Sequence, residues 1–142
     1  MKRTRGALSL AVAAAVALGV FGIQSVGAAE KEYKPKAKVT ALIQEALPGV
    51  AGKKVIIKHF AFPPGFVGGK HFHPGPVYAY VLEGALTIEM EGGGTQTISA
   101  GELYKEPLSR TMRGRNLSTN DWLKIVVFQV GDEGKPMMIK AK

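Results

Sequence analysis

Short runs of β-branched and aromatic residues, each ended by glycine or proline, fill the chain from Lys53 onward. Such runs favour strands, and the Gly/Pro breaks between them favour tight turns. Many short strands at near-regular spacing predict an all-β fold, an antiparallel sandwich or barrel. The predicted strands are Val55–Phe62, Val77–Leu82, Ala85–Met90, Thr95–Ile98, Glu102–Glu106, Thr111–Asn116, Trp122–Val130 and Pro136–Ile139.

The residues before these strands predict a different structure. Thr40–Leu47 could form a short helix, with Thr40 as its N-cap and Pro48-Gly49 ending it, packed on the outside of the β domain. The length of 142 residues suits one domain. We therefore expect a signal peptide at 1–28, an N-terminal extension with a short helix at 29–51, and a β-barrel domain at 52–142.

The first residues have the composition of a targeting segment. Lys2, Arg3 and Arg5 precede an almost wholly apolar run from Ala7 to Ile23, and small residues follow at 26–29. This order is typical of a cleaved bacterial signal peptide, which predicts a periplasmic or secreted protein. The alternative is an uncleaved membrane anchor, because the run approaches the roughly 20 residues that a spanning helix needs. The small-residue junction favours cleavage, so we expect no membrane association of the mature chain.

Charge and cysteine content narrow the function classes. The formal net charge is +8, with 19 basic and 11 acidic residues, and cleavage would remove three basic residues, leaving 16 − 11 = +5. The remaining lysines are scattered rather than clustered with aromatic residues, which argues against nucleic-acid binding. The chain has no cysteine, so any metal must be held by His, Met or oxygen ligands.

Two of the three histidines lie in the stretch KHFHPGP, at His71 and His73. Residues i and i+2 of a strand point to the same side, about 6–7 Å apart at the backbone, so both imidazoles could reach one ion. The third, His59, shares one face of its predicted strand with Val55, Ile57 and Ala61. If that apolar face points inward, His59 could join the site; otherwise it is a histidine at the edge of the core.

The spacing around these histidines resembles that of a known family. The pattern Gly65-x5-His71-x-His73-x3-Val77-x6-Gly84, followed by Gly101-x5-Pro107-x-Ser109-x2-Met112-x3-Asn116, is similar to the two motifs of the cupin superfamily. The resemblance covers roughly residues 52–130 and suggests a small single-domain, type-2-like cupin. It implies an antiparallel double-stranded β-helix, also called a jelly-roll or cupin barrel, and a homodimer.

Two ligand positions depart from the family pattern. In metal-binding cupins the motif-one glutamate and the motif-two histidine join the His pair, but here those positions are Val77 and Met112. The set His71, His73 and Met112, with His59 as a further ligand, combines imidazole with thioether, which suits copper and especially Cu(I). We therefore prefer copper and leave Fe, Mn, Ni and Zn open.

The sequence leaves three functions open. The preferred one is an exported cupin that binds a metal ion, a small ligand or both through His71 and His73. The second is a metal-dependent enzyme, dioxygenase-like or lyase-like, although no catalytic acid or base is evident. The third is a degenerate barrel with only a structural role, as an interaction module in a dimer. A Met112 that only fills space in the core would weaken the first function.

Overall fold

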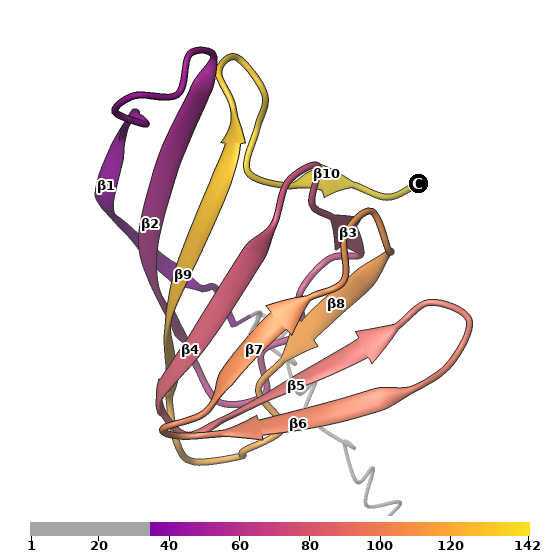
Figure 1. The fold of residues 1–142 in the computed structure, drawn as a ribbon. Helices are drawn as coiled ribbons and strands as arrows, with labels where there is room; N and C mark the ends of the chain where they lie inside the picture. Colours follow the sequence, from indigo (N-terminus) through magenta and orange to yellow (C-terminus); the bar gives the residue numbers. More distant parts are fainter. Residues whose placement is uncertain (1–34) are drawn as a thin grey trace, which may run out of the picture. The chain divides into compact units, whose positions relative to one another are not determined.

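Two five-stranded antiparallel sheets face each other in the computed structural model, which describes residues 35–142 (Figure 1). Sheet A has the strand order β1-β2-β9-β4-β7, and sheet B the order β10-β3-β8-β5-β6. The strands are β1 Lys38–Ala46, β2 Lys53–Phe62, β3 His71–Phe72, β4 Val77–Glu83, β5 Ala85–Met90, β6 Thr95–Ser99, β7 Leu103–Glu106, β8 Met112–Arg115, β9 Leu123–Asp132 and β10 Ile139–Lys140. The all-β, double-stranded β-helix prediction is confirmed.

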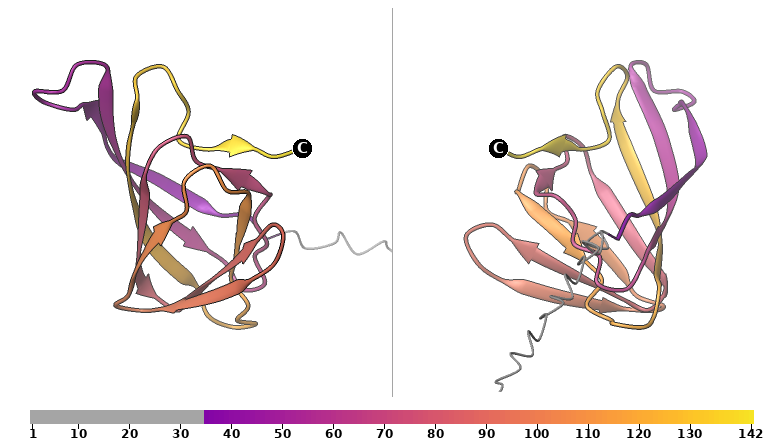
Figure 2. Two further views of the ribbon diagram at one scale, coloured as in Figure 1. Left: turned by 45° about the vertical axis from the view of Figure 1, so that its right-hand side comes forward. Right: turned by 180° about the vertical axis from the view of Figure 1, so that it is seen from behind.

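The core lies between the two sheets and is built by alternation along the strands. β4 contributes Val77, Ala79 and Val81, while β9 contributes Leu123, Ile125 and Val127. Sheet B supplies the opposing buried side chains, Leu86, Ile88, Ile98 and Met112. Because every second residue of a strand faces the same side, these positions bury one face of each sheet. Figure 2 shows the two sheets from two other directions.

The short helix predicted over Thr40–Leu47 is wrong. Residues 40–46 of this segment lie in β1, which pairs antiparallel with β2 at the edge of sheet A. A lone eight-residue helix is only marginally stable in water, whereas pairing with β2 satisfies one row of backbone donors and acceptors. All nine residues of β1 are exposed, so its backbone pairing rather than side-chain burial holds it in the sheet.

Glycine allows the bend at which the chain leaves β4 in sheet A and enters β5 in sheet B. Gly84 has a φ of +76°, and a Cβ there would lie 2.9 Å from the Trp122 carbonyl oxygen. A side chain would therefore be both strained and crowded at this position. The strands on either side of Gly84 belong to different sheets, so a hairpin between Val77–Leu82 and Ala85–Met90, with Glu83-Gly84 as its turn, is not formed, and β5 pairs with β6 and β8 instead.

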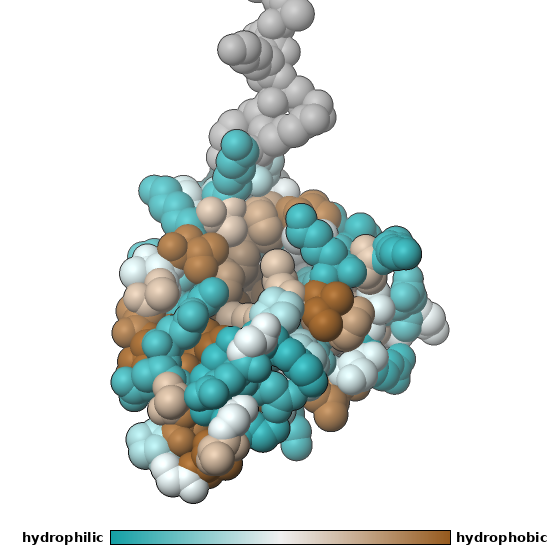
Figure 3. All heavy atoms as spheres, turned by 90° about the horizontal axis from the view of Figure 1, so that it is seen from above, coloured by the Kyte–Doolittle hydropathy of each residue, from teal (hydrophilic) through white to brown (hydrophobic). Residues whose placement is uncertain are grey.

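The remaining surface mixes hydrophilic and apolar side chains. Seen from above, brown apolar groups lie between teal hydrophilic ones (Figure 3). The described part of the chain contains no helix of the length and hydrophobicity that crossing a membrane requires. The predicted signal peptide lies outside the described residues.

Candidate metal centre

The His-x-His strand brings two imidazoles together. β3 is very short, but the rings of His71 and His73 project to one side, with centroids 5.0 Å apart and planes at 88°. His73 is buried, and His71 is partly exposed. The two rings therefore meet edge to face beside the core, as the spacing predicts.

Backbone carbonyls orient both rings in the same way. His71 Nδ1 lies 2.9 Å from the Gly69 carbonyl oxygen, and His73 Nδ1 lies 2.8 Å from that of Met137. A carbonyl can only accept, so each Nδ1 carries the proton and each Nε2 keeps its lone pair in the neutral ring. This is the arrangement by which metal-binding histidines are commonly held in position.

A buried carboxylate completes the group. Glu106 lies at the end of β7, and ligand atoms of His71, His73 and Glu106 all lie within 4.8 Å of one another. Glu106 Oε2 is 2.8 Å from His73 Nε2, and when the His73 ring is neutral, with its proton on Nδ1, no described residue donates to this oxygen. A buried carboxylate oxygen without a donor is costly, and a cation between these atoms would satisfy it.

Strand pairing explains why the carboxylate is there. Val77 of β4 and Glu106 of β7 are direct cross-strand partners, so their side chains emerge side by side on the inner face of sheet A. A valine at position 77, where the family pattern has a glutamate, predicts a site without a carboxylate. The structure corrects this: the carboxylate comes from the neighbouring strand instead of from position 77.

The protonation of His73 depends on two opposing influences. Burial is the largest single influence and by itself lowers the pKa of His73. The short contact to Glu106, the charge of that carboxylate and the bond to the Met137 carbonyl together raise the pKa above the ordinary value of 6.5. The Glu106 carboxylate therefore favours the protonated form of His73 by more than burial disfavours it.

The two other predicted ligands, Met112 and His59, differ in where they lie relative to the His pair. Met112 is a direct cross-strand partner of His71 and is almost fully buried. His59 pairs with Thr40 and Val126, on the face of β2 opposite to Phe60 and Phe62, which pack on the core. His59 is therefore not brought to the group formed by His71, His73 and Glu106.

Glu106 is the site residue that sequence reasoning missed. The sequence shows that Glu106 ends a predicted strand directly before Pro107. It does not show which strand pairs with that one. A register shift of one residue would turn its side chain to the outer face, and the sequence does not fix the register between β4 and β7. Only the pairing of Val77 with Glu106 shows that the carboxylate faces inward.

A double-stranded β-helix with two histidines and a carboxylate on its inner side defines a barrel with a candidate metal centre. The family model described as "Cupin domain" matches residues 58–128. The chain therefore belongs to the cupin family. No curated protein matches it.

Solved structures show the same fold at low identity. DMSP lyase DddQ from Ruegeria pomeroyi DSS-3 is 19% identical with a TM-score of 0.59, over 74% of this chain and 51% of that chain. A cupin domain from Bordetella pertussis Tohama I is 22% identical with a TM-score of 0.57, over 71% and 99% of the two chains. A cupin superfamily protein from Desulfitobacterium hafniense DCB-2 is 15% identical with a TM-score of 0.58, over 72% and 84%. This chain thus spans about half the length of the DMSP lyase.

Proposed function

We propose that the protein is an exported cupin that binds a divalent transition metal through His71, His73 and Glu106 and takes a small ligand beside it. The observation that carries the proposal is the convergence of their ligand atoms within 4.8 Å, with two of the three residues buried. Two imidazoles and one carboxylate suit Fe(II), and the same donor types suit Mn, Ni and Zn. The hard oxygen of Glu106 moves this set away from the copper preference of the sequence analysis.

Three protein ligands leave coordination positions for a ligand or a substrate. Open positions are a feature of catalytic metal sites, and a metal held here would act as a Lewis acid on a bound oxygen. A lyase or dioxygenase is therefore the second candidate function. Two of the similar structures are described as DMSP lyases, which supports the fold and leaves the substrate open.

The experiment is elemental analysis of the protein purified without a His tag, beside a His71→Ala/His73→Ala variant. We expect near-stoichiometric metal in the wild type and none in the variant. The intact mass, measured on the same sample, should lack the leader if the chain is exported and cleaved. Turnover that depends on both histidines would favour the enzyme. Absence of metal after incubation with Fe(II), Mn(II), Ni(II) and Zn(II) would leave a structural barrel.

We also propose a homodimer through the outer face of sheet A. The core-facing residues of β2 are Ile56, Phe60 and Phe62, so the alternate residues face outward. By the register of β2, β9 and β4, the outer face carries the apolar residues Val55, Ile57, Ala61, Val126, Phe128, Val130, Tyr78 and Tyr80, together with His59 and Lys124. A largely apolar, partly exposed sheet face favours a contact surface, and a second copy offers the same face.

Val126→Lys tests the homodimer. Val126 is the direct partner of both His59 and Tyr80, near the middle of the outer face, so a lysine would place a charge in the interface. Sedimentation velocity should show a dimer for the wild type and a monomer for Val126→Lys. Lys124→Arg, on the same face of β9, is the control and should leave the dimer intact. A wild-type protein that sediments as a monomer would contradict the proposal.

A further inference from the structure

Three soft or borderline metal donors form a row across sheet B. His71 of β3 pairs directly with Met112 of β8, and Met112 pairs directly with Met90 of β5. Direct cross-strand partners point to the same face, with Cβ atoms about 5 Å apart. Met112 belongs to the core, so this row lies on the inner face of the sheet.

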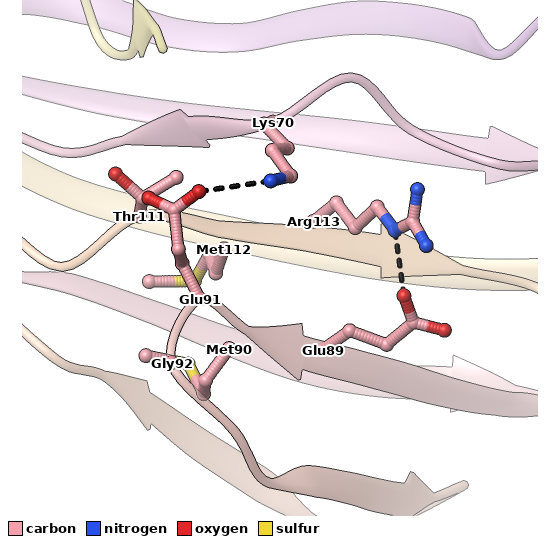
Figure 4. Close-up of a pocket in the computed structure, with 8 residues that line it drawn as sticks. All are labelled: Lys70, Glu89, Met90, Glu91, Gly92, Thr111, Met112 and Arg113. Carbon is pink, nitrogen blue, oxygen red and sulfur yellow. Dashed lines mark hydrogen bonds and ion pairs between the residues drawn. The ribbon is translucent and has the colours of Figure 1, made fainter.

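The two methionines also border open space. Met90 and Met112 line one pocket of about 240 Å³. Figure 4 shows the side chains of Met90 and Met112 next to each other, coming from the neighbouring strands β5 and β8. Met112 is 1% exposed, whereas Met90 is only partly buried against the core, so Met90 is the methionine nearer to solvent.

The charged groups of the pocket are already paired. Lys70 Nζ lies 2.8 Å from Glu91 Oε1, and Arg113 Nε lies 2.6 Å from Glu89 Oε2 (Figure 4). The pocket therefore has no unpaired cationic side chain among the residues that line it, and its paired carboxylates offset the two positive charges. The donors left free are the neutral sulfur atoms, which are the softest ligands available in a chain without cysteine.

We propose that Met90 and Met112, with Nε2 of His71, form a Cu(I) site beside the divalent-metal site. Thioether and imidazole donors suit Cu(I), whereas the carboxylate of Glu106 suits harder divalent ions. The inference extends the proposed function because His71 serves both sites, but it needs neither His73 nor Glu106. Cu(I) and a divalent ion should therefore compete for the protein through one shared imidazole.

The test is an anaerobic competition titration of Cu(I) against bicinchoninate. Met90→Leu and Met112→Leu conserve side-chain volume, so they should preserve the fold while removing the sulfur. We expect each to weaken Cu(I) binding by at least about 10-fold, because loss of a partner that only supports a metal ligand already costs about 10- to 100-fold. Met138→Leu is the matched control, because Met138 is 49% exposed and lies outside the row, and its Cu(I) affinity should equal that of the wild type.

A parallel titration with Co(II) separates this proposal from the proposed function. Met90→Leu and Met112→Leu should bind Co(II) as the wild type does, whereas Glu106→Gln should lose Co(II) and keep Cu(I). His71→Ala should lose both ions. Unchanged Cu(I) affinity in both methionine variants, or no Cu(I) binding by the wild type, would overturn the copper site. Failure of the wild type to bind Co(II), with the Cu(I) pattern intact, would overturn the divalent site alone.

Discussion

Glu106→Val is expected to abolish divalent-metal binding, and adding Val77→Glu to that variant is expected to restore it. The two positions are direct cross-strand partners on the inner face of sheet A, so the swap moves the carboxylate by about 5 Å and keeps the composition of the pair. Loss of Glu106 should weaken Co(II) binding by at least about 100-fold, the upper end of what loss of even an outer partner costs. Isothermal titration of metal-free protein with Co(II) measures each step.

Glu133→Gln is the control for the loss of a carboxylate, because Glu133 is exposed and lies outside the candidate site. Its Co(II) affinity should match that of the wild type. If Glu106→Val binds Co(II) normally, the carboxylate is not a ligand and the buried pair with His73 has a structural role. If the swap variant does not recover, the ion needs the oxygen on β7, and the equivalence of the two positions is refuted.

Gly75→Ala is expected to be the most destabilising single methyl addition in the loop after β3. A Cβ at Gly75 would lie 2.5 Å from the Val130 carbonyl oxygen, and this contact is backbone, which has little freedom to move. Overpacking of this kind costs about 1–3 kcal/mol, occasionally more. Because Gly75 lies between His73 and Val77, displacement of the loop should also weaken metal binding.

Gly69→Ala is the matched control, since a Cβ there meets no heavy atom within 4 Å and its φ is not in the left-handed region. Its free energy of unfolding should stay within about 0.5 kcal/mol of the wild type. Urea unfolding of the metal-free proteins, followed by circular dichroism, makes the comparison. Equal stability of the two variants would show that β9 yields at Val130 and that the loop is not held by this contact.

Local sequence signals predicted most of the strands because glycine and proline mark their ends. Ala85–Met90 was predicted with the bounds that β5 has, between Gly84 and the glycines at 92–94. The helix predicted over Thr40–Leu47 failed for a tertiary reason. Its residues carry too weak a local preference to resist pairing with β2, and the sequence does not reveal that an edge of the sheet is available.

The sequence predicted only the part of the candidate site whose residues are close together in the chain. His71 and His73 are two residues apart, so one strand suffices to bring them together, whereas Glu106 depends on the register of two strands. For His59, the alternation along β2 correctly predicted which residues share its face. The sequence could not show whether that face points to the core or to the outside. Sheet A is apolar on both faces, with Ile57 outside and Ile56 inside, so hydrophobicity does not tell which face is buried.

The pairing of β10 with β3 affects the order in which the site can form. Lys140 pairs with His71, and the Met137 carbonyl that holds His73 is 64 residues away in the chain. Closing so long a loop is entropically costly and slows folding, so contacts of this kind form late. The imidazoles should therefore reach their final orientation only after the rest of the barrel has formed. Metal binding with the affinity of the native protein would then show that a folding chain is folded as far as residue 140.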